Sequence, residues 1–356
     1  MATMMKGPAL KKMAPWVLLL MVIGFGLQRQ KTPQPEVHSV THLAMGTLFT
    51  VSVWGVPESA ADAAVAQAFA RIRDIESWAS RQIKSSLVYK INHAPPSEFF
   101  HVPEELALIV ETALKVKTLS HGAFDPGLAY LLDLWGFGHG APDVGKVPDK
   151  KDIQAWLEAR HRKSGDGIHL DRPKNGAPTI RLDDPAFALD LGAIAKGYAL
   201  DQAMEALERT GIHNALIIGG GDMIIAGSKG GKPWRIGIQH PRDHDKVMAA
   251  AEVVGHMAMA TSGDYERFFM ADGERQHHIF DSRTGTPSRS GLISVSVQMD
   301  KLMMADALST AIFVLGMEKG QEFVKHLKGV EVLMVTEKGE RWKSPGFQGQ
   351  WLEGPQ

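Results

Sequence analysis

The alternation of apolar and polar residues along the chain predicts a mixture of strands and helices. Residues 42–55 alternate apolar side chains with Thr50 and Ser52, which is typical of a strand with one buried face. Short turns join several neighbouring strand-like runs, and this favours antiparallel pairing. Further strands are predicted at residues 214–227, 233–241 and 292–299, and a closing hairpin at 328–344.

Amphipathic segments predict helices at residues 59–80, 104–122 and 187–211, the last beginning as a turn. Residues 303–320 predict a helix that is apolar almost all round, and such helices are normally buried. The polar segment 138–167 separates two subdomains in this interpretation. We therefore predict an α+β fold of mixed, largely antiparallel sheets with flanking helices.

Composition narrows the possible functions of the 356-residue chain. The formal net charge is −1 with no long run of one sign, which argues against a nucleic-acid-binding surface. The absence of cysteine excludes disulfides, cysteine-ligated metal centres and thiol nucleophiles.

The first residues have the pattern of a targeting segment. Lys6, Lys11 and Lys12 precede an apolar run at 14–27, which is typical of a cleaved signal peptide or an uncleaved membrane anchor. We expect residues 1–36 to comprise this segment and a linker. The folded domain is expected at 37–350 and a short tail at 351–356.

Asp306 is the most informative residue of the predicted apolar helix. An unpaired buried carboxylate is costly, so it must be paired, protonated or bound to a metal ion. Thr310 lies four residues further on, so both oxygens project from one face of the helix. Two hard oxygen ligands suit Mg²⁺. The alternative is an aspartate that caps neighbouring backbone.

Two glycine-rich segments suggest a ligand-binding site. Asp190 ends an apolar run, and Lys196 lies in the first turn of a helix, where a cation is unfavourable unless an anion is present. This favours a phosphate-bearing ligand, and the alternative is a solvated lysine. In the segment "GAFDPGLAYLLDLWGFG", Trp135 and Phe137 lie between glycines, so they either stack on a flat ring or belong to the core.

The segment from Thr261 to Arg283 is rich in polar residues beside predicted strands. His278 is a candidate general base near neutral pH. Adjacent residues in a strand point to opposite faces, so we expect one histidine of the His277–His278 pair to face outward without a role. Gly219 to Asp222 predict a tight hairpin, because neither the helix nor the lysine of a phosphate loop follows.

Taken together, these segments resemble the ApbE family of FAD:protein FMN transferases over roughly residues 41–320. The resemblance rests on motifs in a fixed order. They are "MGT" at Met45–Thr47, "GAFDP…LWGFG", "DLGAIAKGYALD", "GGGD" followed by "PWRIGIQHP", "ATSGDYERFF", "HIFDSRTG" and "MADALSTAIFVLG".

The resemblance implies a cleft for FAD between the two subdomains and a reaction assisted by Mg²⁺. A Thr or Ser hydroxyl of a target protein attacks the FMN-side phosphorus of FAD, and AMP leaves. By motif, His278 and Asp306 would be catalytic. The metal would be held by Ala193, Asp306, Ser309 and Thr310. The FAD-binding site would be lined by Met45, Ala123, Phe124, Asp125, Asp190, Lys196 and Ile279.

The resemblance also implies a location and partners. Family members work mostly outside the cytoplasm, so we expect a periplasmic protein, anchored to the inner membrane if residues 14–27 are retained. Expected acceptors are redox proteins such as subunits of the Na⁺-translocating quinone reductase or of Rnf-type complexes. Without cysteine the chain is not a lipoprotein.

The chain departs from the family pattern at residues 79–92, "ASRQIKSSLVYKIN", where an acidic pair is missing while Ser86 and Asn92 remain. Two alternative functions stay open at this point. One is a Mg²⁺-dependent FAD pyrophosphatase that gives FMN and AMP, and the other is a flavin-binding protein without turnover.

Overall fold

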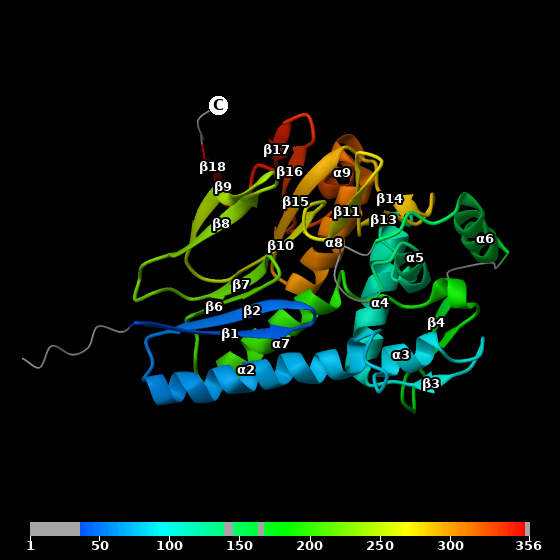
Figure 1. Ribbon diagram of the computed structural model, residues 1–356. Coiled ribbons are helices and arrows are strands. Elements are labelled where there is room, and N and C mark those ends of the chain that lie inside the picture. Colours follow the sequence, from blue (N-terminus) through cyan, green and yellow to red (C-terminus); the bar gives the residue numbers. More distant parts are fainter. Residues whose placement is uncertain (1–35, 139–144, 163–166, 353–356) are drawn as a thin grey trace, which may run out of the picture. The chain divides into compact units, whose positions relative to one another are not determined.

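The predicted strands assemble into an eight-stranded sheet in the computed structural model, which describes residues 36–138, 145–162 and 167–352 (Figure 1). Every neighbouring pair in this sheet is antiparallel. The predicted first strand is itself a hairpin, because Met45 and Gly46 form a two-residue turn within it. The strand order is β1 (Val37–Ala44), β2 (Thr47–Trp54), β6 (Ala215–Gly219), β7 (Asp222–Ala226), β10 (Met257–Gly263), β15 (Leu292–Met299), β16 (Glu331–Thr336) and β17 (Arg341–Lys343).

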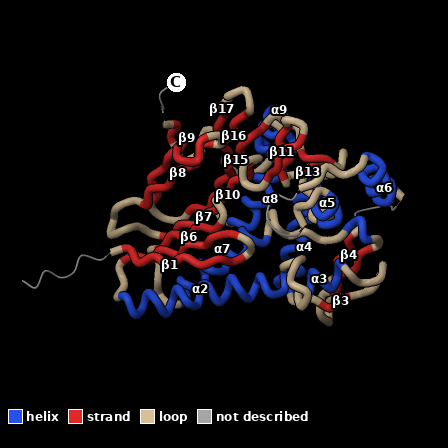
Figure 2. The backbone as a smooth tube through the Cα atoms, in the orientation of Figure 1, coloured by secondary structure: helices blue, strands red, loops and turns tan. Residues whose placement is uncertain are grey.

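Helices cover one face of this sheet (Figures 1 and 2). They are α2 (Glu58–Ala79), α7 (Ala195–Arg209) and α8 (Leu302–Leu315), with α4 (Glu104–Leu119) packed against α8. The largest hydrophobic cluster lies between helices and sheet and includes Phe49, Ile72 and Phe313, each of which is fully buried. Burial of such side chains stabilises the fold by about 1.5–3 kcal/mol each.

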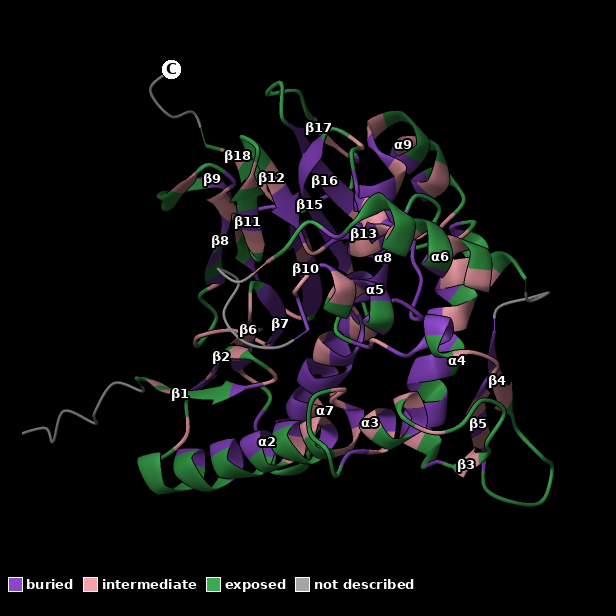
Figure 3. Cartoon of the chain, turned by 45° about the vertical axis from the view of Figure 1, so that its right-hand side comes forward, coloured by how far each residue is buried: buried purple, intermediate pink, exposed green. Residues whose placement is uncertain are grey.

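A second, smaller sheet packs on the opposite face of the central strands. Its strand order is β18 (Gln350–Trp351), β9 (Asp243–Val253) and β8 (Trp234–His240). Because β7, β10 and β16 are covered on both faces, their successive residues enter different clusters, as Ile224 and Ile225 do. Figure 3 shows these strands as buried. This double burial explains why the segment "IIGGGDMII" is apolar on both faces instead of alternating.

The remaining elements form a third region of the fold (Figure 1). Its own hydrophobic cluster contains Trp135, Phe137, Phe269 and Phe280. Trp135 and Phe137 are therefore core residues, and the interpretation that their faces are accessible to a flat ring is wrong. The elements are α3 (Leu87–Asn92), α5 (Ala129–Leu134), α6 (Lys150–His161), η2 (Pro185–Phe187), β3 (Phe100–His101), β4 (Ile168–Asp171), β5 (Thr179–Leu182), β11 (Phe268–Ala271), β12 (Glu274–His277), β13 (Phe280–Asp281) and β14 (Thr286–Pro287).

The apolar segment at 303–320 forms two helices instead of one. The helix α8 ends at Gly316, and α9 (Met317–Lys325) begins directly after it. Gly316 has a φ of 83°, a backbone conformation that glycine adopts without the steric cost of a side chain. The helix α8 is buried nearly all round, as its composition predicts.

The fold confirms the predicted α+β class with largely antiparallel sheets. Residues from Val37 onwards belong to one compact unit. The expected targeting segment at 14–27 lies outside the described residues. Within the ranges that the structure describes, no helix is long and apolar enough to cross a membrane.

Candidate functional site

Asp306 and Lys196 meet where the N-terminal turn of α7 lies against α8. The Nζ atom of Lys196 lies 3.3 Å from each carboxylate oxygen of Asp306 and 2.9 Å from Oδ2 of Asp222. All three side chains are at least three-quarters buried. The sequence predicted an external anion for Lys196, but in the structure two aspartates of the protein provide the negative charge.

The backbone of α7 also binds Asp306. The first N–H groups of a helix have no partner within the helix, and the N–H of Gly197 donates to Oδ2 of Asp306 over 3.0 Å. Asp306 therefore caps neighbouring backbone, which is one of the two predicted possibilities, and its role as a metal ligand stays a prediction. The carbonyl of Ala193, one turn earlier, accepts no hydrogen bond from the described residues.

Asp222, the last residue of the predicted hairpin at 219–222, belongs to this cluster of charged side chains. It lies at the start of β7, is only 1% exposed, and accepts a hydrogen bond from the N–H of Thr261 over 3.0 Å. Among the described residues, the partner of its Oδ2 atom is the ammonium group of Lys196, at 2.9 Å. The "GGGD" motif contained this aspartate, but a residue directly after a hairpin turn is normally exposed.

The carboxylates of this centre carry more negative charge than one lysine neutralises. Burial raises the pKa of Asp306 to about 7, with Asp222 adding to the effect and Lys196 opposing it. Glu266 reaches solvent in part, and burial of its carboxyl group together with the charge of Asp222 raises its pKa as well. A divalent cation placed here would relieve this repulsion.

Hydroxyl groups complete the set of hard oxygen atoms. Ser262 on β10 contacts Ser309 over 2.8 Å and Thr310 over 3.2 Å, both on α8. Ser309 also donates to the carbonyl of Asp306. These hydroxyl oxygens fit Mg²⁺, which prefers hard oxygen ligands, as do Oδ2 of Asp222 beside Lys196 and the carbonyl of Ala193. Within the described ranges, no three His, Asp or Glu side chains form a metal-holding group by themselves.

The two adjacent histidines have different environments, and the expectation that one faces outward without a role is wrong. His277 is buried, and its Nε2–H donates to the carbonyl of Ser288 over 3.0 Å while Nδ1 accepts from the N–H of Ile279 over 3.3 Å. Both of its nitrogens are used within the fold, and burial lowers its pKa to about 4.

His278 keeps one ring nitrogen available. Its Nδ1 lies 3.2 Å from the carbonyl of Arg267, and a carbonyl only accepts, so Nδ1 carries the proton and Nε2 has the lone pair. Burial, Arg267 and His277 lower the pKa of His278 to about 3, and Lys196 adds to this. The ring is thus neutral at physiological pH. An anionic ligand beside it would raise its basicity.

Two arginines from different parts of the chain meet at Phe137, whose ring centroid lies 6.4 Å from that of His278. Arg81 and Arg267 both donate to the carbonyl of Phe137, over 3.4 Å and 3.0 Å. Arg81 is paired with Asp133 and Asp190, at 2.6 Å and 2.5 Å. Arg267 has no carboxylate within ion-pair distance among the described residues, so its charge is open to an anionic ligand.

Asp125 and Asp190 are both engaged by the protein's own cations. Asp125 is buried and pairs with Arg160 at 2.5 Å and Lys117 at 3.3 Å, while Asp190 pairs with Arg81. The N–H of Asp190 donates to the carbonyl of Pro126 over 2.7 Å, which ties the two segments together. Their carboxylates hold loops in place, so a ligand would meet them through backbone or through the bound arginines.

Ser86 and Asn92, the residues left from the family segment at 79–92, have structural contacts. Ser86 caps α3 by accepting the N–H of Tyr89 over 3.0 Å. Asn92 exchanges two hydrogen bonds with the backbone of Leu189, at 2.8 Å and 2.6 Å. Asn92 therefore braces the residue that precedes Asp190.

The other predicted cofactor-binding residues are held by local contacts of their own. Met45 has a φ of 49°, rare for a residue with a side chain, and its N–H donates to Glu76 over 2.7 Å. The side chains of Ala123, Phe124 and Ile279 are buried. The segments of Ala123 and Ile279 meet where Ser282 donates to the carbonyl of Gly122 over 2.8 Å.

The predicted polar set between Thr261 and Arg283 does not converge on one point. Asp264 receives two hydrogen bonds of 2.7 Å from Arg242. Asp281 pairs with Arg283, only two residues away, at 2.7 Å. Of this set, Thr261 and Ser262 belong to the Asp306 centre, because sheet register brings β7 and β10 together.

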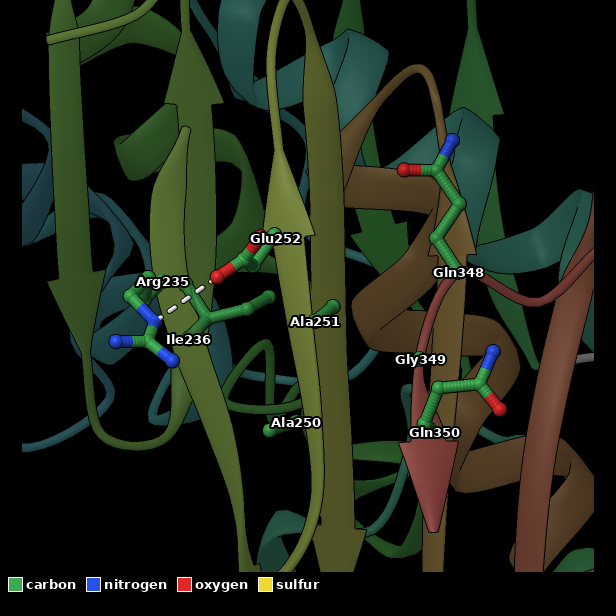
Figure 4. A pocket seen from close by; sticks show the side chains of 8 residues that line it. All are labelled: Arg235, Ile236, Ala250, Ala251, Glu252, Gln348, Gly349 and Gln350. Atoms are coloured by element: carbon green, nitrogen blue, oxygen red, sulfur yellow. Dashed lines mark ion pairs between the residues drawn. The ribbon is translucent and has the colours of Figure 1, made fainter. Parts of the chain in front are cut away.

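A surface recess lies elsewhere, on the small sheet (Figure 4). It is lined by residues of β8, β9 and the C-terminal strand, including the ion pair of Arg235 and Glu252 at 3.1 Å. None of the predicted site residues lines it, and we assign the chemistry to the Asp306 centre, which contains the buried charges.

The fold and this centre define an α+β protein suited to a divalent cation and a phosphate-bearing ligand. The profile of the ApbE family matches residues 45–334. The chain therefore belongs to the ApbE family.

Named relatives agree with this assignment over most of the chain. It is 34% identical to the FAD:protein FMN transferase of Klebsiella pneumoniae, covering 91% of this chain and 93% of that protein. The counterpart in Salmonella typhimurium is 32% identical over 89% and 90% of the two chains. The ApbE protein of Thermotoga maritima superposes with a TM-score of 0.76 at 33% identity, over 87% of this chain and 97% of that one.

Proposed function

We propose that the protein is an FAD:protein FMN transferase that uses Mg²⁺. The hydroxyl oxygen of a Ser or Thr in a target protein forms a bond to the FMN-side phosphorus of FAD. The bond from that phosphorus to the bridging oxygen breaks, and AMP leaves with the bonding electrons. Family membership supports the reaction class, and the Asp306 centre supports the chemistry.

The observation that carries this proposal is the clustering of Lys196, Asp222 and Asp306 with the hydroxyls of Ser262 and Thr310. The cation would be held by Asp306, Ser309, Thr310 and the carbonyl of Ala193. Because Lys196 is shared between two aspartates, we propose Asp222 as a further contributor. When bound, Mg²⁺ would neutralise charge on the pyrophosphate.

The residues of the chain have distinct roles in this proposal. His278 accepts the proton of the attacking hydroxyl at Nε2, a contribution of roughly 10²–10⁴-fold to the rate. The carbonyl of Arg267 fixes the tautomer of His278 that leaves this nitrogen available. Lys196 holds the two aspartates in place and offers positive charge to the phosphate oxygens. The FAD site would be lined, through backbone and apolar contacts, by Met45, Ala123, Phe124, Asp125, Asp190 and Ile279.

The proposal extends to location and partners. We propose that the protein acts in the periplasm, with residues 14–27 as export signal or inner-membrane anchor. Its acceptors would be redox proteins flavinylated on Ser or Thr, such as subunits of the Na⁺-translocating quinone reductase or of Rnf-type complexes. Co-expression with each candidate, followed by mass spectrometry, would identify the acceptor.

The reaction is tested by incubating the purified protein with FAD, Mg²⁺ and a candidate acceptor. We expect FMN covalently attached to the acceptor and one AMP released for each FMN transferred, both lost on chelation of the metal. Free FMN with unmodified acceptor would instead identify a pyrophosphatase. FAD that stays intact through a long incubation with Mg²⁺ would identify a flavin-binding protein without turnover.

A further inference from the structure

The helices α7 and α8 cap each other at their N-terminal turns. Asp306 on α8 accepts the N–H of Gly197 on α7, as described above. In return, Asp201 on α7 accepts the N–H of Leu302 at Oδ1 over 3.0 Å and the N–H of Met303 at Oδ2 over 2.9 Å. Asp201 is only 6% exposed, so these bonds are shielded from water.

The cap from Asp201 replaces one that α8 lacks in its own sequence. The residue before the helix, Lys301, makes no side-chain cap hydrogen bond. Without Asp201, the N–H groups of Leu302 and Met303 in the first turn would lose their acceptors, and Leu302 is fully buried. The negative charge of Asp201 also lies at the positive end of the helix dipole.

The two helices are in close backbone contact at this point. A Cβ atom built on Gly197 would lie 2.4 Å from the carbonyl oxygen of Leu302. The close approach lets Lys196 and the N–H of Gly197 reach Asp306, which lies one turn beyond the capped residues. A shift of α8 along its axis would therefore move Asp306 away from α7 and from Asp222.

We infer that Asp201 is a positioning residue for the proposed FMN transfer, an inference that rests on the proposed function. By holding the first turn of α8, it sets the position of Asp306 and Thr310 and so the affinity of the site for its divalent cation. Both carboxylate oxygens of Asp201 are occupied by backbone N–H groups of α8, so Asp201 acts through this helix.

The inference is tested with the variants Asp201→Asn and Asp201→Ala in the full chain. The Asn side chain keeps the volume and one acceptor oxygen, while Ala removes both. Partners that orient metal ligands typically contribute roughly 10–100-fold to metal affinity. We expect the Mg²⁺ concentration for half-maximal FMN transfer to rise by about 10-fold in Asp201→Asn and further in Asp201→Ala, with the maximal rate partly restored at high Mg²⁺.

A second readout does not depend on turnover. Calorimetric titration of Mg²⁺ into the FAD-loaded protein should show the same order of affinity, wild type above Asp201→Asn above Asp201→Ala. The affinity for FAD without Mg²⁺ should stay within about twofold of wild type, because Asp201 acts through α8.

Asn214→Ala is the matched structural control. The Asn214 side chain accepts the N–H of Ser228 over 2.9 Å at the end of β6 remote from the Asp306 centre. Its loss should lower Tm and leave the Mg²⁺ affinity unchanged. If Asp201→Ala does not fold, Asp201→Asn decides the question.

Wild-type Mg²⁺ affinity in Asp201→Asn would overturn the inference, as would an equal loss of affinity in Asn214→Ala. A wild-type protein that binds Mg²⁺ but transfers no FMN would refute the proposed function, and the calorimetric series would still test Asp201. A wild-type protein that binds no Mg²⁺ would overturn both.

Discussion

Lys196 and Asp306 are joined across the contact between α7 and α8, with the lysine Nζ 3.3 Å from both carboxylate oxygens. The lysine is shared with Asp222, so one positive charge faces two buried negative charges. Burial of ion pairs is not by itself stabilising, because desolvation offsets much of the attraction. A centre of this kind is more readily explained by a ligand that completes it than by a contribution to stability.

Replacement of Asp306 by alanine should abolish Mg²⁺-dependent FMN transfer and leave the fold intact. The variant removes a carboxylate whose charged form is disfavoured by burial, and Lys196 keeps Asp222 as its partner. We expect transfer to fall by more than about 100-fold, beyond the effect of a residue that only orients a ligand. Transfer is measured by mass spectrometry of the acceptor, and folding by circular dichroism.

Asp152→Ala, at an exposed position on α6, is the control for the loss of an aspartate. Its activity should match that of wild type. Normal transfer by Asp306→Ala would show that the metal assignment is wrong.

Substitution of the two adjacent histidines should have different effects, one on activity and the other on stability. His278→Ala removes the ring with the available Nε2, so transfer should slow by roughly 10²–10⁴-fold while FAD still binds. His277→Ala leaves a cavity and the carbonyl of Ser288 without its donor, so unfolding free energy should fall by about 2–4 kcal/mol. Single-turnover kinetics and chemical denaturation of both variants provide the comparison, and unchanged kinetics in His278→Ala would remove it from the mechanism.

Acidification should destabilise the protein through His277. Its pKa is about 4 in the folded protein against an ordinary value near 6.5, so the unfolded chain binds more protons between these pH values. Stability is therefore lost as pH falls across this window, by about 3 kcal/mol from this residue. In the metal-free protein Asp306 acts in the opposite direction, because its raised pKa favours folding below pH 7.

The contribution of His277 is isolated by comparing wild type with His277→Gln, whose amide can form both hydrogen bonds without titrating. Urea denaturation between pH 7 and pH 4 should show a smaller loss of stability in the variant. If the unfolding free energies of the two proteins fall equally between pH 7 and pH 4, His277 is not buried in its neutral form.

Gly197→Ala should be more harmful than glycine replacement in a helix usually is. Alanine has the better helix propensity by about 1 kcal/mol, but the added Cβ would lie 2.4 Å from backbone oxygen of α8. Overpacking against backbone costs about 1–3 kcal/mol or more. We therefore expect a lower Tm and a lower affinity for Mg²⁺. Gly320→Ala in α9 is the control, since its Cβ would meet a side-chain methyl of Ile312 at 3.0 Å.

Much of the architecture follows from the local pattern of the sequence. The alternation in β2 and the glycine turn between β6 and β7 predicted these elements, because side-chain direction in a strand depends only on local geometry. The buried character of α8 followed from its composition. The sequence predicted one helix over 303–320, whereas the structure breaks it at Gly316, and α9 is largely polar with Gly320 and Val324 as its buried residues.

The sequence by itself determined which residues are candidates for the chemistry: Asp306 in an apolar helix, Lys196 at a helix start, and His278 in a polar segment. Tertiary structure alone decided their partners. Asp222 joins the site because β7 lies beside β10, and Asp201 faces α8 because two helices cross closely at Gly197. Such contacts join residues about 100 positions apart, and pairing over that distance is set by the packing of whole elements, which local pattern does not encode.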